Sequence, residues 1–283
     1  MSSRFPESIA AVVLVIASTM PMHAIASSTA SGKPAELRVC AEPDNLPFSH
    51  RDGSGFENAI AQVLARDLQR TVRYTWLPNR RGFVRKTLNA RDCDVIIGVP
   101  HRFDLVRTTA PYYRSSYVFV FRATDGPRVT SFADPAIRRL HVGIPLVADD
   151  FAATPPGHAL VHVGAIDNVA GFPIDGDGTQ GERIVRAVAA REIDIGIVWG
   201  PQAVFHGRRQ PAALVYARAQ APATLAGVPF EYAIAMGVRK DDAALLEELD
   251  TAIARRRAEI DAILESYGVP RTDAGFEAAT TQP

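Results

Sequence analysis

The chain has 283 residues, of which 47% are hydrophobic and 22% are charged. This length is enough for one or two domains with a sizeable core. Lys and Arg together number 31, as do Asp and Glu, so the formal net charge is zero. That balance removes the electrostatic argument for nucleic acid or an anionic membrane as the main partner.

Residues 1–26 have the pattern of a secretion signal. Arg4 gives a weakly basic start, residues 9–20 are apolar, and Ala24-Ile25-Ala26 matches a small-x-small cleavage site. An uncleaved anchor is the less favoured alternative, because the apolar stretch is short for a bilayer span. We therefore expect a mature chain that begins near Ser27, lies in the periplasm and has no membrane span.

The next part of the chain alternates between strand and helix patterns. We predict strands at 37–41, 72–76 and 94–99, with helices at 54–69 and near 82–90. Ser54 and Glu57 have the spacing of a capping box. The alternation predicts a parallel, doubly wound α/β sheet, in which the proline-rich loop 42–49 is placed to present ligand-binding groups.

A second α/β segment follows a long aromatic strand at 111–121. Its predicted strands are 140–144, 159–163, 193–198 and 212–216, and its predicted helix is 181–191. After this segment, the sequence predicts a strand at 232–238 and a long helix at 241–267. The stretch 171–178 is rich in Gly and Asp and is expected to be loop. The tail 272–283 has little to bury and is expected to be flexible.

Cys40 and Cys93 are the two cysteines of the chain. An exported protein with a small, even number of cysteines is a candidate for one disulfide, which would add about 4 kcal/mol in the chain-entropy model. The alternative is two buried thiols at different heights on neighbouring parallel strands, since disulfide geometry is strict. We favour the disulfide slightly.

The chain resembles the two-lobed periplasmic solute-binding proteins of family 3 over almost all of its mature length. The motifs that carry the resemblance are Glu42-Pro-Asp-Asn-Leu-Pro-Phe48, Cys93-Asp-Val-Ile-Ile-Gly98, Pro111-Tyr-Tyr-Arg-Ser115 and Tyr232-Ala-Ile-Ala-Met-Gly-Val-Arg-Lys240. The resemblance implies a type II binding-protein fold in which each lobe is a doubly wound, mainly parallel sheet and two crossing strands form the hinge. It places lobe 1 at 36–122 plus 225–270, lobe 2 at 125–220 and a flexible tail at 271–283.

Three further stretches resemble a narrower group, the quinoprotein-dehydrogenase-associated proteins that include the J proteins of methanol oxidation. They are Asn79-Arg-Arg-Gly-Phe-Val-Arg-Lys-Thr-Leu88, Gly98-Val-Pro-His-Arg-Phe-Asp-Leu-Val106 and Ile197-Val-Trp-Gly-Pro201. The resemblance implies a monomeric accessory protein beside a pyrroloquinoline-quinone (PQQ)-dependent alcohol dehydrogenase and its cytochrome c. PQQ is then expected in the partner enzyme or as a ligand.

Two departures from ordinary amino-acid binders argue against an amino-acid ligand. Those proteins bind the carboxylate with an Arg in a Thr-x-x-Arg context beyond the third strand, which 98–111 lacks although Arg102 is nearby. They bind the amine with an Asp at a position where Trp199 stands here. An indole offers only cation–π attraction, about 0.5–2 kcal/mol.

We expect the ligand cleft to lie around the opening loop and the hinge. The residues expected to line it are Glu42, Asp44, Asn45, Phe48, Arg80, Arg81, Pro100, Arg102, Tyr113, Arg114 and Trp199. Arg80 and Arg81 form a basic cluster with Arg85 and Lys86. This cluster is suited either to a carboxylate or phosphate, or to an acidic partner. Most aromatic residues of 111–121 are expected in the core.

Metal binding and catalysis have no sequence support. The stretch 175–178 lacks the ligand series of a calcium loop and is expected to be a surface turn, and His158 and His162 lack further zinc ligands. Nucleophile-elbow, dinucleotide and phosphate-loop motifs are missing. We expect a binding protein. The alternatives are the substrate-binding protein of an ABC transporter for a small polar or aromatic solute, with a permease as partner, and an extracytoplasmic enzyme on the same fold.

Overall fold

The computed structural model describes residue 1 and residues 35–147, 152–174 and 178–280. The predicted secretion signal, apart from Met1, and residues 175–177 of the predicted surface turn lie outside these ranges. The described residues from 35 onward form one compact unit. Within the described ranges, the structure has no helix with the length and apolar character of a membrane span.

The first group of strands is parallel, as predicted. β1 (Glu36–Ala41) lies between β4 (Thr71–Trp76) and β5 (Val95–Pro100), and α1 (Phe56–Asp67) packs against them. The core of this group contains Leu37, Val39 and Ile97 from the strands, together with the α1 residues Ile60 and Leu64. The carboxyl ends of β1 and β5 therefore meet at one edge of the sheet, where α/β proteins bind ligands.

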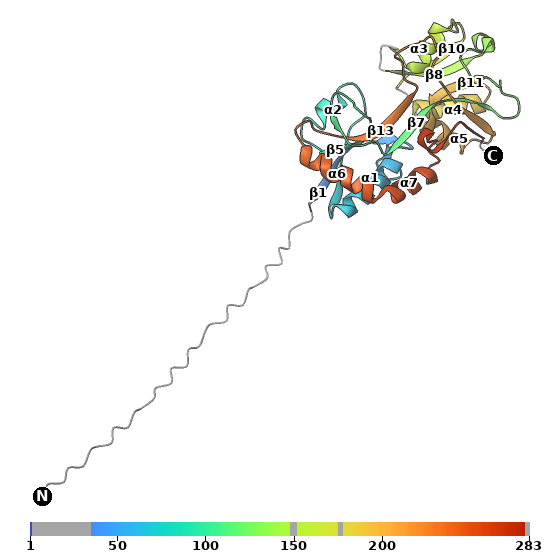
Figure 1. The fold of residues 1–283 in the computed structure, drawn as a ribbon. Helices are drawn as coiled ribbons and strands as arrows, with labels where there is room; N and C mark the ends of the chain where they lie inside the picture. Colours follow the sequence, from blue (N-terminus) through green and yellow to red (C-terminus); the bar gives the residue numbers. More distant parts are fainter. Residues whose placement is uncertain (2–34, 148–151, 175–177, 281–283) are drawn as a thin grey trace. The chain divides into compact units, whose positions relative to one another are not determined.

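Two long strands connect this group to the rest of the sheet (Figure 1). Residues 113–116 of β7 (Tyr113–Arg122) pair with β13 (Glu231–Val238), and residues 117–122 pair with the second group. β13 also pairs with β5 on its other side. In the described part of the chain, this gives the order β10-β8-β11-β7-β13-β5-β1-β4.

The second group has its own core. β8 (Val142–Val147) pairs in parallel with β10 (Val169–Phe172) and β11 (Ile195–Trp199), whereas β12 (Leu214–Arg218) is antiparallel to β7. Ile144 and Ile195 pack with Phe119 on one face. On the other face, α4 (Gln180–Ala189) contributes Ile184 and Val188. The second core thus comes from residues far from those of the first.

Several short elements complete the described chain. They are β2 (Asp44–Asn45), β3 (Ser49–His50), α2 (Phe83–Lys86), β6 (Arg107–Thr108), η1 (Pro135–Arg139), β9 (Ala152–Ala153), α5 (Gly200–Gly207) and η2 (Thr272–Ala274). The predicted loop 171–178 begins two residues too early, because Gly171 and Phe172 belong to β10.

The strand predicted at 159–163 is wrong. These residues belong to α3 (Pro155–His162), which begins at Pro155, a residue whose fixed φ suits the first turn of a helix. His158 and His162 therefore lie one turn apart on a helix, and His162 Nε2 is 2.7 Å from Thr224 Oγ1. No cluster of three or more metal-ligating side chains occurs among the described residues.

The C-terminal region differs from the prediction at two places. The long helix is divided into α6 (Ala243–Arg255) and α7 (Arg257–Ser266) at Arg256, whose Nε donates to Asp67 at 2.7 Å. The expected flexible tail forms β14 (Ala278–Thr280), which pairs with β12. Edge pairing uses backbone groups, so it needs no apolar side chains and leaves no hydrophobic pattern.

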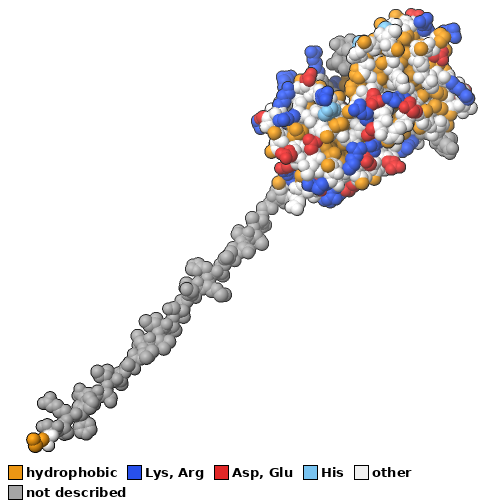
Figure 2. Space-filling model, viewed as in Figure 1, with side chains coloured by type: hydrophobic (Ala, Val, Ile, Leu, Met, Phe, Trp, Pro, Cys, Tyr) orange, Lys and Arg blue, Asp and Glu red, His pale blue; other side chains and the backbone are white. Residues whose placement is uncertain are grey.

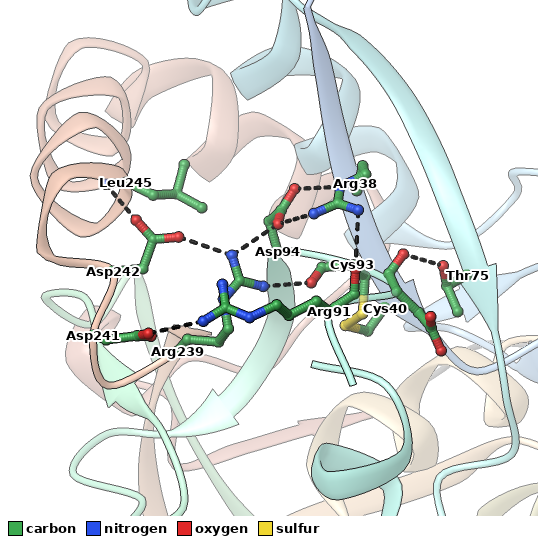
Figure 3. Close-up of polar contacts among 11 residues, drawn as sticks. Arg38, Cys40, Thr75, Arg91, Cys93, Asp94, Arg239, Asp241, Asp242 and Leu245 are labelled. Carbon is green, nitrogen blue, oxygen red and sulfur yellow. Dashed lines mark hydrogen bonds and ion pairs between the residues drawn. A yellow bond between two sulfur atoms is a disulfide. The ribbon is translucent and has the colours of Figure 1, made fainter. Parts of the chain in front are cut away.

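A disulfide and a group of ion pairs fasten β1 to the two residues that precede β5 (Figure 3). Cys40 is bonded to Cys93 with the Cα atoms 5.4 Å apart, which confirms the favoured alternative. Asp94 accepts hydrogen bonds from Arg38 Nε at 2.7 Å and Arg239 Nη2 at 2.9 Å. Burial raises the pKa of Asp94, but the two guanidinium groups outweigh it and hold this pKa below its ordinary value.

Candidate ligand-binding site

The opening loop is fixed onto the first turn of α1. Its hairpin pairs β2 with β3, and Ser49 Oγ donates to the Glu42 carbonyl at 2.8 Å. The amides of Phe56 and Glu57 donate to the carbonyls of Pro47 and Phe48, both at 2.8 Å. Loop and helix therefore form one rigid piece beside the end of β1.

The predicted capping box is wrong by one position. Gly55 precedes α1, and Asn58 Oδ1 accepts a hydrogen bond from its amide at 3.2 Å, while Ser54 is exposed. A Cβ at Gly55 would lie 2.1 Å from the Phe48 carbonyl oxygen, so glycine allows the loop to approach. The side chain of Glu57 therefore does not cap the helix and lines a cavity instead.

That cavity has a volume of about 180 Å³. It lies among the carboxyl ends of β1 and β5, the opening loop, the start of β7 and Trp199 from β11. Six of the predicted cleft residues line it: Glu42, Asn45, Phe48, Pro100, Tyr113 and Trp199. Because pockets for drug-sized ligands span roughly 300–1,000 Å³, this cavity suits a smaller solute.

Glu57 is a cavity residue that sequence reasoning missed. Burial, followed by repulsion from Glu42, raises its pKa to about 8. Burial also raises the pKa of Glu42, against the lowering effect of a hydrogen bond from the Asn79 backbone. A Cβ at Gly98 would lie 2.0 Å from Glu57 Oε1, so glycine in β5 makes space for the carboxyl group. That glycine, within an otherwise apolar strand, was the available sequence signal.

The cavity offers acidic and aromatic groups to a ligand. No Lys or Arg is among the described residues that line it. Since a buried carboxylate needs a cation or several donors, a ligand carboxylate is poorly accommodated beside Glu42 and Glu57. Near neutral pH, Glu57 is mainly protonated and can donate a hydrogen bond. The site therefore favours a neutral polar or cationic ligand.

Aromatic rings give the cavity rigid walls. Trp199 packs edge-on against Tyr117 and Tyr232, with ring centroids 5.5 and 5.7 Å apart. The ring centroids of Tyr113 and Phe56 are 6.0 Å apart in an edge-on arrangement. Tyr112, Phe119 and Phe121 are buried in the cores, in line with the expectation for most of that strand. The aromatic side chains that line the cavity itself are Phe48, Phe83, Tyr113 and Trp199.

Five predicted cleft residues lie outside this cavity. Asp44 is exposed and 3.9 Å from His50, Arg114 is paired with Glu231 at 3.4 Å, and Arg102 is exposed on a turn with φ of 63°. Arg80 and Arg81 line a neighbouring pocket instead. Asn79, the residue before them, lines both pockets, so the boundary between the two pockets falls within the segment after β4. Residue spacing carries no information on which side of that boundary a side chain lies.

Comparisons with known proteins agree over most of the chain. The bacterial extracellular solute-binding proteins, family 3, match residues 37–270. Protein MoxJ of Methylorubrum extorquens is 31% identical over 260 residues, which cover 87% of this chain and 84% of that protein. MoxJ of Paracoccus denitrificans is 29% identical, over 86% of this chain and 92% of that protein.

Solved structures of periplasmic binding proteins are also similar to most of the chain. The periplasmic binding protein XoxJ from Methylobacterium extorquens AM1 is 32% identical with a TM-score of 0.69, covering 83% of this chain and 98% of that one. MxaJ from Methlophaga aminisulfidivorans MPT is 25% identical with a TM-score of 0.73, covering 83% and 99%. The predicted type II periplasmic-binding-protein fold is thereby confirmed.

Proposed function

The chain belongs to the bacterial extracellular solute-binding proteins, family 3, and from this premise we propose that it is a periplasmic accessory factor of a PQQ-dependent alcohol dehydrogenase. It acts by binding rather than by catalysis. The similarity to MoxJ and XoxJ, at 31% and 32% identity, supports this role because it extends over 87% and 83% of the chain. The stretches 79–88, 98–106 and 197–201 carry the narrower resemblance.

The residue types that line the cavity are the observation that best supports the proposal. An amino-acid binder needs a cation for the ligand carboxylate and a carboxylate for its amine. The resemblance puts Trp199 where amino-acid binders carry the amine-binding Asp, and no Lys or Arg is among the described residues that line the cavity. Amino-acid import is therefore poorly supported, and a role through protein contact fits better. PQQ, which carries carboxylates of its own, is assigned to the partner enzyme for the same reason.

Co-purification tests the role directly. A tagged chain expressed in its host is expected to retain a quinoprotein dehydrogenase through washing at low salt. Deletion of the gene is expected to abolish or strongly reduce PQQ-dependent alcohol oxidation in periplasmic extracts, and a plasmid copy to restore it. Normal dehydrogenase activity in the deletion strain, with no enzyme retained on the tagged chain, would contradict the proposal.

A second candidate is the binding component of an ABC importer for a small amine. The carboxyl groups of Glu42 and Glu57 beside the ring of Trp199 favour this ligand class. An importer ligand stabilises the folded state by mass action. A melting-temperature rise with a small amine, together with unchanged alcohol oxidation on deletion, would replace the first candidate by this one.

A further inference from the structure

A second, larger pocket lies beside the cavity. Its volume is about 470 Å³, and it shares a boundary with the cavity along Phe83, Gly98 and Pro100. We call it the basic pocket and define it by its lining: Asn79, Arg80, Arg81, Gly82, Phe83, Val84, Arg85, Asn89, Ile96, Gly98, Val99, Pro100, Phe103 and Leu105. Its volume is within the range of pockets that hold a side chain or a drug-sized ligand.

The charge of the basic pocket is of one sign. No Asp or Glu is among its described lining residues. Arg80 is attracted to Glu42, but Arg81 and Arg85 are exposed and make no ion pair with the described part of the chain. Asp104 is exposed on the adjoining turn and does not line the pocket.

Several exposed arginines elsewhere in the described chain are paired with a carboxylate. Arg191 lies 2.9 Å from Asp125 and Arg91 lies 3.0 Å from Asp241. Others, such as Arg139 and Arg186, are exposed without an ion pair among the described residues. Arg81 and Arg85 differ from these because they share one pocket with apolar side chains. Figure 2 shows Lys and Arg side chains at the edge of the molecule where Figure 1 places α2.

Apolar side chains form the inner wall of the same pocket. Leu105 is 56% exposed and is one of the few large hydrophobic side chains at the described surface. Phe103 is partly buried beside it, and Phe83 is buried beneath. A basic surface that contacts only water does not require an exposed leucine inside a pocket. Apolar surface rimmed by arginine is instead the composition of a protein-binding site.

We propose, on the basis of the proposed function, that the basic pocket docks an acidic segment of the partner dehydrogenase. Carboxylates of the segment pair with Arg81 and Arg85, because a guanidinium group binds a carboxylate through two parallel hydrogen bonds. An apolar side chain of the segment covers Leu105 and Phe103. A free anion would leave this apolar wall in water, and a flat membrane surface does not enter a concave pocket.

Binding of the purified quinoprotein alcohol dehydrogenase to variants of the full mature chain tests the proposal. We expect the variant Arg81→Glu/Arg85→Glu to bind at least tenfold more weakly than the wild type and to lose its salt dependence. Leu105→Ser, which removes the apolar side chain without changing the charge of the pocket, is expected to weaken binding. The matched control is Arg139→Glu/Arg186→Glu, which makes the same charge change at exposed residues outside the pocket.

The outcomes separate the docking site from the function itself. Wild-type affinity in Arg81→Glu/Arg85→Glu, with unchanged far-UV circular dichroism, overturns the docking site and leaves the accessory role standing. Failure of the wild-type chain to bind the dehydrogenase overturns the accessory role. If the wild type binds phosphatidylglycerol vesicles and the pocket variant does not, the assignment to a polypeptide is overturned. Equal losses in pocket and control variants also overturn the site, since a nonspecific charge effect would explain them.

Discussion

Glu57 places an ionisable carboxyl group in a cavity that it shares with Glu42. Its pKa is raised from 4.5 to about 8, so the folded chain retains a proton that the unfolded chain releases. The corresponding stability is fully present below the unfolded pKa and is lost as the pH rises through about 8. At the scale of single residues, this is the clearest functional signature of the molecule.

Replacement of Glu57 by Gln is expected to flatten the pH dependence of stability. Between pH 5 and pH 8, the wild type should lose up to about 1.4 kcal/mol per pH unit relative to E57Q, because only the wild type has this proton to lose. Urea unfolding at several pH values measures the difference. The exposed Glu265 provides the control E265Q, and parallel curves for wild type and E57Q would refute the raised pKa.

The disulfide is expected to stabilise the folded chain. The Cys40–Cys93 bond closes a loop with a sequence separation of 53 residues. Its removal in C40A/C93A is expected to lower the free energy of unfolding by about 4 kcal/mol in the chain-entropy model. A reductant should destabilise the wild type and leave the double variant unchanged. Equal denaturant midpoints for wild type and variant would show that the bond does not contribute.

Among the elements, the start of α1 determines the shape of the opening loop. Gly55→Ala is expected to destabilise the fold by about 1–3 kcal/mol, since its Cβ would meet the Phe48 carbonyl. Ser54→Ala, the neighbouring change, is expected to stay within about 0.5 kcal/mol because the exposed Ser54 does not cap the helix. Thermal unfolding compares the two, and the reverse order of effects would restore the capping-box interpretation.

The C-terminal strand is expected to stabilise the second group of strands. β14 pairs with β12, Phe276 packs against the second core, and Arg218 N donates to the Glu277 carbonyl at 2.8 Å. Deletion of residues 276–283 should cost about 1–3 kcal/mol. Glu277→Gln, which removes only an exposed ion pair, should cost less than about 1 kcal/mol. An unchanged melting temperature after the deletion would favour the flexible tail of the sequence-based prediction.

The melting temperature of the whole molecule is expected to depend on the charge of the added solute. Glutamate and other carboxylates are expected to leave the melting temperature unchanged at millimolar concentration, because the described cavity lining has two acidic residues and no basic one. A ligand at 100 times its dissociation constant would add about 2.7 kcal/mol, so a thermal-shift screen detects binding readily. Stabilisation by an acidic amino acid that persists in the Arg81→Glu/Arg85→Glu variant would show that the cavity binds a carboxylate despite its two acidic residues.

The predicted site was recovered only in part, for reasons visible at particular residues. Glu42, Asn45 and Phe48 surround one cavity because the proline-rich loop must follow the end of β1. Arg102 and Arg114 lie outside it, since a spacing along the chain does not give the direction of a side chain after a turn or on a crossing strand. Whether these residues bind a ligand stays a prediction.

The sequence by itself determined most strands and helices of the α/β cores, with α3 as an exception, because apolar periods of two and 3.6 residues are local properties of a chain. It also identified the binding-protein family and the two cysteines that form the disulfide. Only the tertiary structure decided that Glu57 faces the cavity, that β14 joins β12, and that Arg81 and Arg85 share a pocket with Leu105. These relations depend on contacts between residues distant in the sequence, for which a single chain shows no periodic signal.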